Sequence, residues 1–209
     1  MLEKKRGPGG RAFLLPAARF CQEPFRQGRR FFVTRANTLS TRGDLNMTKT
    51  LDDLFLDTLK DIYFAERQIV KALPKMARAA QSDDLKEAFK NHREETEGQI
   101  ERLQQVFELL GKPARGKTCE AIQGIIEEGE EIIEDFKDTP ALDAGLISAA
   151  QAVEHYEMAR YGTLIAWAKQ LDKKDVVKLL EETFEQESTA DLELSKLAEK
   201  SLNAHAKAA

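Results

Sequence analysis

Seven side chains in this sequence have the chemistry of metal ligands, and all of them fall on or beside the apolar stripes of predicted helices. Glu66 occupies the stripe position between Ile62 and Ile69, where a packed helix would be expected to carry an apolar residue. The other six are His92, Glu95, Glu154, Glu157, Glu187 and Asp191. Carboxylate oxygens combined with an imidazole suit iron or manganese held between facing helices. The residue types therefore indicate a metal site inside a helical protein.

The spacing of these residues predicts that they meet at one height of a bundle. Glu66 lies 15 residues before a turn near Gln81, and Glu95 lies 14 residues after it. Glu157 and Glu187 each lie 15 residues from a second turn at Asp172. In an antiparallel hairpin, equal distance from the turn means equal height. We expect four core ligands, with three further residues completing or flanking the site. The core ligands are Glu66, Glu95, Glu154 and Glu187, and the other three are His92, Glu157 and Asp191.

Acids that converge in a dry core have three ways to avoid an isolated negative charge. They can take up a proton, pair with Lys or Arg, or bind a metal ion, because an unpaired buried charge costs several kcal/mol. The stripes carry no basic residue at this height, and Arg160 is the nearest candidate. Metal binding is the first hypothesis. The alternative is a non-catalytic structural or interaction dimer in which the core acids are protonated or paired.

Four long helices in two hairpins are predicted to position these side chains. Apolar residues recur in steps of three, four or seven from Leu51 to Ala80, with Pro74 expected to kink or loosen one turn. A second helix begins at an N-cap signal, Ser82-Asp83-Asp84, and stops at Gly111-Lys112-Pro113. Two more helices follow, one beginning at Thr139-Pro140 and one running from near Val176 to Ala198.

The segment between the two hairpins predicts a shorter amphipathic helix over residues 119–137. Its acidic run, Glu127 to Glu131, is expected to be a solvated face, and its isoleucines form a wide apolar surface that needs a cover. Two hairpins joined by such a crossover predict an all-α fold, an antiparallel four-helix bundle of the ferritin-like kind with a short extra helix in the long crossover.

Residues 1–46 differ from the rest of the chain in net charge and in hydrophobic pattern. They hold ten Lys or Arg against three acids, a net charge of +7, while residues 47–209 hold 22 basic and 33 acidic residues, a net charge of −11. The first segment has no sustained hydrophobic period. We expect a basic, disordered N-terminal extension over 1–46, or upstream sequence before a true start at Met47, and a bundle over 47–209.

Composition and charge exclude several classes of protein and make others less favoured. The apolar runs are too short to cross a bilayer, and two cysteines are too few for a disulfide scaffold or a four-cysteine zinc site. The acidic body repels phosphate, so nucleic-acid binding through the basic leader is the weaker hypothesis. The Arg-rich leader also leaves organelle targeting as a minor alternative to a cytoplasmic location.

Four stretches resemble the YciE/YciF-type stress proteins of the ferritin-like superfamily. They are LKDIYFAERQIVKALP at 59–74, HREETE at 92–97, AAQAVEHYEMARYG at 149–162 and LEETFEQESTAD at 180–191. The resemblance implies a cytoplasmic bacterial protein, a homodimer, and a di-iron or manganese centre in the bundle core. If the protein is an enzyme, we expect oxidation of Fe(II) by dioxygen or peroxide.

The sequence departs from the wider superfamily pattern, in which two helices each carry Glu-x-x-His. Here the second helix reads His92-x-x-Glu95, and the residue three after Glu187 is Ala190. One histidine is therefore available at the metal layer.

Overall fold

The computed structural model describes residues 48–207, and the regular secondary structure in this part of the chain is entirely helical. No strand occurs between these residues, as the sequence predicts. The long helices are α1 (Leu51–Ala79), α2 (Asp83–Leu109), α4 (Leu142–Gln170) and α5 (Lys174–Leu197). The crossover contains the shorter α3 (Glu120–Asp135), and the chain continues beyond α5 as a π-helical turn (Ala198–Leu202) and α6 (Asn203–Lys207). The predicted antiparallel four-helix bundle with an extra crossover helix is confirmed.

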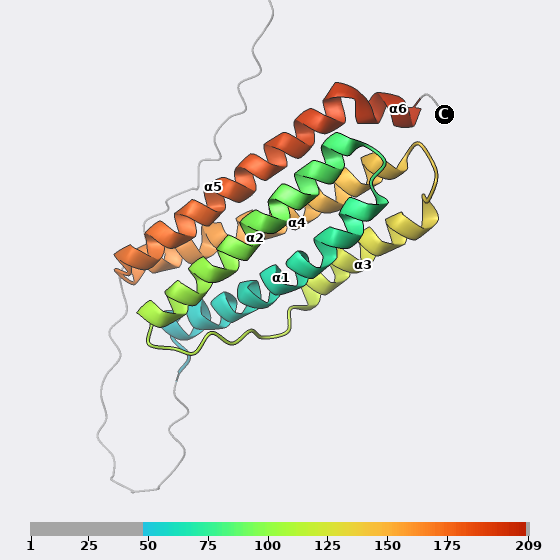
Figure 1. Cartoon of the computed structure of the whole chain (residues 1–209). Coiled ribbons are helices and arrows are strands. Elements are labelled where there is room, and N and C mark those ends of the chain that lie inside the picture. The colour runs from blue at the N-terminus through green and yellow to red at the C-terminus, as the bar shows by residue number, and fades with distance from the viewer. Residues whose placement is uncertain (1–47, 208–209) are drawn as a thin grey trace, which may run out of the picture. The chain divides into compact units, whose positions relative to one another are not determined.

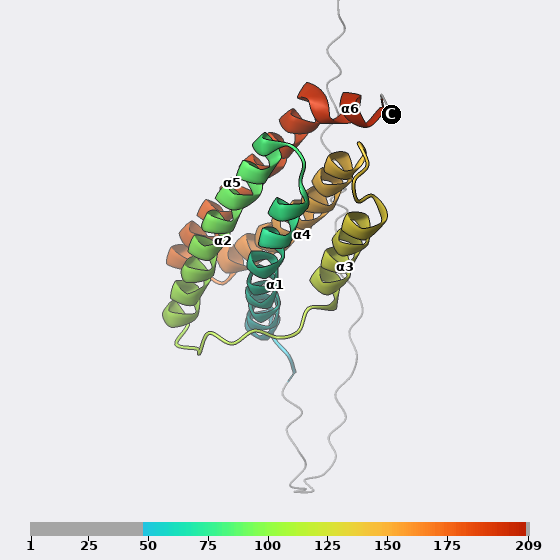
Figure 2. The same ribbon diagram turned by 45° about the vertical axis from the view of Figure 1, so that its right-hand side comes forward.

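The bundle consists of two hairpins placed side by side. Helices α1 and α2 form one hairpin and α4 and α5 form the other, with α2 packed beside α5 and α1 beside α4 (Figure 1). Helix α3 contacts α1 and α4 and therefore lies on the side of the bundle away from α2 and α5 (Figure 2). All four long helices consequently face a common interior.

The ends of the helices follow from local chemistry. Thr50 and Asp53 form a reciprocal capping box at the start of α1, and the Ser82 hydroxyl accepts from the Leu85 N–H at the start of α2. Gly111 ends α2 with a φ of 63°, a conformation that glycine adopts at little cost. Asp172 takes the same role between α4 and α5 with a φ of 55°. The turn at residues 80–82 between α1 and α2 and the turn at Asp172 determine which residues of each hairpin lie at equal height.

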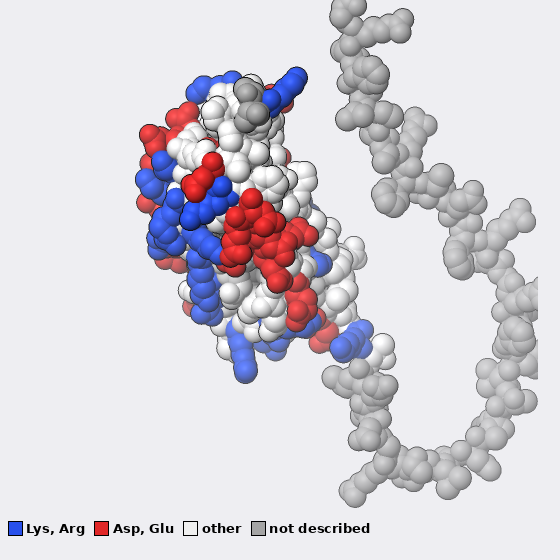
Figure 3. Space-filling model, turned by 90° about the vertical axis from the view of Figure 1, so that its right-hand side faces the viewer, with Lys and Arg blue, Asp and Glu red and all other residues white. Residues whose placement is uncertain are grey.

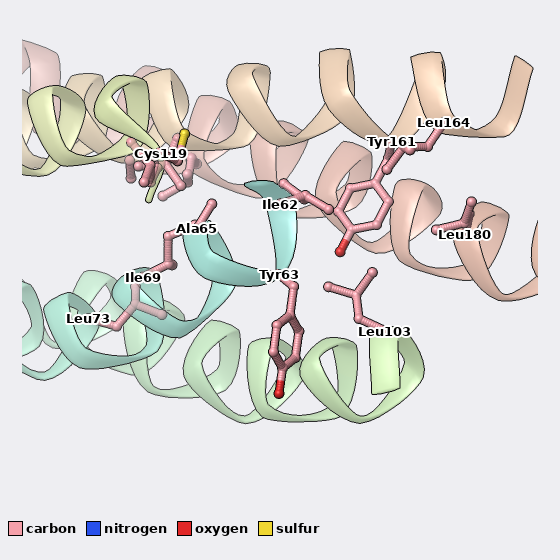
Figure 4. Packing of buried hydrophobic residues seen from close by; sticks show 14 of the residues in the cluster. Ile62, Tyr63, Ala65, Ile69, Leu73, Leu103, Cys119, Tyr161, Leu164 and Leu180 are labelled. Carbon is pink, nitrogen blue, oxygen red and sulfur yellow. The ribbon is translucent and has the colours of Figure 1, made fainter. Parts of the chain in front are cut away.

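Large apolar side chains fill the interior on both sides of the predicted metal layer. Ile62 of α1, Leu164 of α4 and Leu180 of α5 are almost completely buried on the side of the α4–α5 turn (Figure 4). Leu73 of α1 and Leu146 of α4 are buried on the other side. Tyr63 extends from α1 toward α2 (Figure 4). Its ring forms a T-shaped pair with that of Phe107 on α2, with the ring centroids 5.5 Å apart. This core gives the carboxylates described below an apolar surrounding.

The structure differs from the sequence-based expectation in two details, while Pro74 lies inside a continuous α1, where the sequence places it. Pro140 lies in the turn before α4 and not in its first helical turn, because α4 begins at Leu142. The C-terminal tail, which the hydrophobic pattern left without an element, turns back as α6 after the π-helical turn.

The apolar side of α3 is covered by its own bundle. Its isoleucines, Ile125, Ile126, Ile132 and Ile133, are half-buried and pack against the core. Its acidic run faces solvent as predicted, and acidic side chains gather on this side of the molecule (Figure 3). This intramolecular cover removes the sequence-based reason for a partner at α3, so the expected homodimer rests on the family resemblance.

The predicted extension over residues 1–46 lies outside the described residues, and the boundary at Met47 stays a prediction. Between residues 48 and 207, no helix combines the length and apolar character that crossing a membrane requires.

Asp143, in the first turn of α4, ties the two hairpins together. Its carboxylate is buried and accepts from the backbone N–H groups of Gln81 and Ser82, both at 2.8 Å. Replacing Asp143 by alanine leaves both N–H groups without an acceptor. Because hydrogen bonds to a charged group contribute about 1.5–3 kcal/mol each, we expect Asp143→Ala, which removes two of them, to lower the free energy of unfolding by about 3–6 kcal/mol.

Urea unfolding followed by circular dichroism measures this effect. Asp143→Asn keeps one acceptor and should lose less, while Asp135→Ala, an exposed acid at the end of α3, is the control and should change stability by less than about 0.5 kcal/mol. An Asp143→Ala protein as stable as this control would show that the contact between hairpins contributes nothing.

Candidate metal centre

Four of the seven predicted ligands meet in the middle of the bundle. One ligand atom from each of His92, Glu154, Glu157 and Glu187 can be chosen so that all lie within 4.8 Å of one another, and all four residues are buried. We call these four residues the acid–histidine cluster. They come from three helices, with His92 on α2, the glutamates 154 and 157 on α4, and Glu187 on α5.

Helical spacing explains why these side chains converge. Glu154 and Glu157 are three residues apart on α4, so they lie on the same face of that helix. Glu187 is on the buried stripe of α5 between Thr183 and Leu194. On α2 the buried stripe runs through His92, Thr96 and Gln99 at steps of four and three residues.

Glu66 approaches the cluster from α1 and is held by a tyrosine. Its side chain is completely buried, and its Oε1 accepts a hydrogen bond from the Tyr161 hydroxyl. Tyr161 is on α4, four residues after Glu157, and is itself fully buried. The bond leaves the Oε2 atom of Glu66 without a hydrogen-bond partner. Every long helix of the bundle thus supplies at least one titratable group to this layer.

Most polar atoms of this layer have no hydrogen-bond partner. Both carboxylate oxygens of Glu157 and of Glu187 are buried and unpartnered, as is Oε2 of Glu154. His92 Nε2 lies 3.2 Å from Glu154 Oε1, but both ring nitrogens lack a partner with hydrogen-bond geometry. Buried polar groups in folded proteins are nearly always satisfied. A group of buried oxygen and nitrogen atoms without hydrogen-bond partners is the arrangement expected of side chains that coordinate a metal ion.

Basic side chains do not neutralise these acids. Within residues 48–207, no Lys or Arg forms an ion pair with Glu66 or with a glutamate of the cluster. Arg160 lies over the ring of Tyr156, with its guanidinium carbon 5.2 Å from the ring centroid. Arg102 donates to Thr183 at 2.6 Å and to Gln186. Of the three ways to avoid isolated negative charge, pairing with a basic residue is therefore not used here.

Burial shifts the protonation of the acids upward. It raises the pKa of Glu66 to about 8, and the nearby Glu187 adds to this shift. Burial likewise raises the pKa of Glu154 to about 8. For Glu157 and Glu187, burial together with the neighbouring carboxylates raises the pKa well above its ordinary value. Without a cation, these acids favour the protonated form near neutral pH.

His92 is subject to opposing effects. Burial favours the neutral ring, but the surrounding acids Glu95, Glu187 and Glu66 outweigh it, so the pKa of His92 is raised. The glutamates and His92 of this layer therefore tend to hold protons, and a metal ion would have to displace these protons to bind.

Two predicted ligands lie at the edge of the cluster. Glu95, expected in the core, is 46% exposed, and its Oε2 lies 3.8 Å from His92 Nδ1. Asp191 is 18% exposed, accepts from the Gln151 amide at 2.9 Å and lies 3.3 Å from His155 Nε2. The structure therefore brings Glu157, expected only to complete or flank the site, into the cluster and leaves Glu95 at its rim.

Two residues of this layer were not among the predicted ligands. Tyr161 positions Glu66, and its place four residues after Glu157 is the signal that puts it on the same face. Gln99 is completely buried, its amide donates to Gln186 at 3.4 Å, and its Oε1 has no partner. A polar residue on an apolar stripe was the available signal for Gln99.

The donor set fits a metal ion. Three buried carboxylates and one imidazole, with Glu66 beside them, match the ligands that iron and manganese take in helical bundles. The unpartnered oxygens and nitrogens point to the same conclusion from hydrogen bonding alone. Glu66 and the four residues of the acid–histidine cluster are the residues that would hold one or two metal ions.

Comparison with known proteins identifies the family of this chain and supports the fold described above. Residues 50–207 match the family described as a domain of unknown function, DUF892. Protein YciF of Escherichia coli strain K12 is 46% identical over 160 residues, which cover 76% of this chain and 96% of YciF. The crystal structure of this E. coli stress protein superposes with a TM-score of 0.71 over 75% of this chain and 99% of its own.

Two further solved structures share the fold. YcfI from Rhodopseudomonas palustris, for which a structural role is suggested, is 48% identical with a TM-score of 0.70, over 72% of this chain and 96% of its own. Protein XCC3681 from Xanthomonas campestris is 22% identical and superposes with a TM-score of 0.59 over 75% of this chain and 96% of its own. At this identity it supports the fold alone. The chain belongs to the DUF892 family and is a homologue of the stress protein YciF.

Proposed function

We propose that this protein is a ferritin-like stress protein that binds a di-iron or manganese centre through its core carboxylates. The observation that carries the proposal is the set of buried, unpartnered carboxylate and imidazole atoms at one layer of the bundle, with no basic residue of the described chain to neutralise them. The homology to YciF supports the stress role. A cytoplasmic location and a homodimer are part of the same proposal.

Glu66 and the acid–histidine cluster would hold the metal. A bound iron pair would supply reducing equivalents to dioxygen or peroxide, so that Fe(II) and an oxidant are consumed together. The chain's own part is to place five ligands on four rigid helices within a largely apolar surrounding. Tyr161 holds the Glu66 carboxylate in one orientation through its hydroxyl.

Anaerobic equilibrium dialysis against Fe(II) tests the proposal. The wild-type chain should retain one to two ions, and the variant Glu157→Gln, Glu187→Gln should retain none above background, because glutamine keeps the size and loses the charge. Glu128→Gln on the exposed face of α3 is the control and should bind like wild type. Addition of peroxide to the loaded wild type should remove Fe(II) faster than it does in buffer alone.

The alternative is a structural or interaction protein, and the role suggested for YcfI favours it. In that case the raised pKa values of the buried acids keep them protonated, and no ion is needed. Equal iron retention by the wild type and the double glutamine variant would make this alternative the better account.

A further inference from the structure

A cavity of about 610 Å³ opens onto the candidate metal centre. All five helices from α1 to α5 contribute to its walls. Helix α3 lies on the opposite side of the bundle from α2 and α5 (Figure 2). A cavity whose lining includes residues of all three helices therefore extends through the bundle between α1 and α4. His92 and Glu154 line it, so it reaches two residues of the acid–histidine cluster.

The walls of this cavity are mainly apolar. Ile69, Leu73, Phe89 and Val153 line it and are buried in the core. Small residues keep it open, since glycine and alanine recur on α2, α3, α4 and α5 where larger side chains would close it. A cavity of roughly 300–1,000 Å³ with apolar walls and a few convergent polar groups is the usual form of a small-molecule site. Iron or dioxygen alone does not need this much apolar space.

We take the exposed lining residues of α2 and α5 as the mouth of the cavity, and their charge limits what can enter. Glu94, Glu95 and Glu193 line the cavity and are exposed. The two cations among the lining residues already have partners, because Lys75 pairs with Glu130 at 3.1 Å and Arg102 is held by α5. The mouth is therefore acidic, which attracts a cation and repels an anion.

We propose that this cavity binds an apolar amine, with the hydrocarbon body in the cavity and the ammonium group at the glutamates of the α2–α5 mouth. The bound molecule would lie beside His92 and Glu154. Its role as a substrate of the metal centre rests on the proposed function, whereas its binding does not. Displacement of poorly ordered water from the apolar walls would favour binding.

Gly98 provides a way to block the mouth without disturbing the fold. It lines the cavity on α2, and a Cβ atom built there meets no atom within 4 Å. Gly98→Phe therefore adds a ring to the lining of the cavity from a Cβ position that no other atom crowds. Glycine is also a poor helix former, so the change should not destabilise α2. Gly124 is the matched control, because it is also helical with open space at its Cβ but lies outside the cavity lining.

The experiment uses the neutral fluorophore N-phenyl-1-naphthylamine with the metal-free chain. We expect saturable binding of one probe per chain, at least tenfold weaker in Gly98→Phe and unchanged in Gly124→Phe. Protonated decylamine should displace the probe at a concentration at least tenfold lower than decanoate. Equal displacement by the two would overturn the amine assignment, and equal probe binding by wild type and Gly98→Phe would overturn the cavity assignment.

Two further readouts separate this inference from the proposed function and from dimerisation. Gly98→Phe should retain as much Fe(II) as the wild type. A variant that loses probe binding but retains iron normally would show that the cavity is blocked while the metal centre is intact. Absence of probe binding in the wild type, together with a lower sedimentation mass of Gly98→Phe, would show that a second copy of the chain covers the mouth and that the proposal is wrong.

Discussion

Manganese(II) at a hundredfold excess over its dissociation constant is expected to raise the unfolding midpoint of this protein by about 5–10 °C near neutral pH. A ligand that binds only the folded state at that excess stabilises it by about 2.7 kcal/mol. For a domain of this size, each kcal/mol shifts the midpoint by about 2–4 °C. The shift should shrink toward pH 4, because the carboxylate ligands must lose their protons to bind.

The double variant Glu157→Gln, Glu187→Gln should show no metal-induced shift. Both residues are buried with all four carboxylate oxygens unpartnered, so glutamine removes the charge without breaking a hydrogen bond. Glu128→Gln, on the exposed face of α3, should shift like wild type. Differential scanning calorimetry with and without manganese measures all three proteins. A full shift in the double variant would place the binding site elsewhere on the chain.

The metal-free protein should lose stability as the pH rises from about 5 to about 8. The pKa of Glu66 and of Glu154 is raised to about 8 in the folded state, from an ordinary value of 4.5, so between these values the folded chain binds more protons than the unfolded chain. Stability falls with pH wherever the folded state holds the extra protons. The contribution is fully present below about pH 4.5 and is lost as the pH passes through about 8.

Glu157 and Glu187 should add to this loss, because burial and the neighbouring carboxylates also raise their pKa. The double glutamine variant lacks these two acids, so its free energy of unfolding should exceed that of the wild type by about 2 kcal/mol or more near pH 8 and by much less near pH 5. Urea unfolding of metal-free samples at both pH values gives this difference. A difference that is the same at the two pH values would mean that the buried acids do not titrate in this range.

The helices and their order could be predicted because local signals agree with the tertiary fold. Apolar periodicity, the cap at Ser82 and the stop at Gly111 all act within one turn of the chain, and the structure confirms them. The C-terminal turn after Leu197 carries no comparable signal. Its π-helical geometry depends on packing against other helices, which sequence spacing does not report.

The ligand set could be predicted only to the level of helix faces. On α2, positions 92 and 95 are one turn apart, and the sequence does not determine how far the helix rotates about its own axis. The structure buries His92, Thr96 and Gln99, which leaves Glu95 at the rim. On α4 the rotation instead buries both Glu154 and Glu157. The cavity could not be predicted, because its small lining residues are scattered over several helices and meet only after folding.

Anomalous X-ray scattering from crystals soaked in manganese(II) tests the central claim most directly. Data collected at the manganese absorption edge locate the ion independently of any effect on stability. We expect the strongest anomalous peak in the bundle interior, among His92, Glu154, Glu157 and Glu187, with Glu66 beside it. A well-ordered crystal with manganese peaks only at surface acids, and none at these residues, would contradict the account.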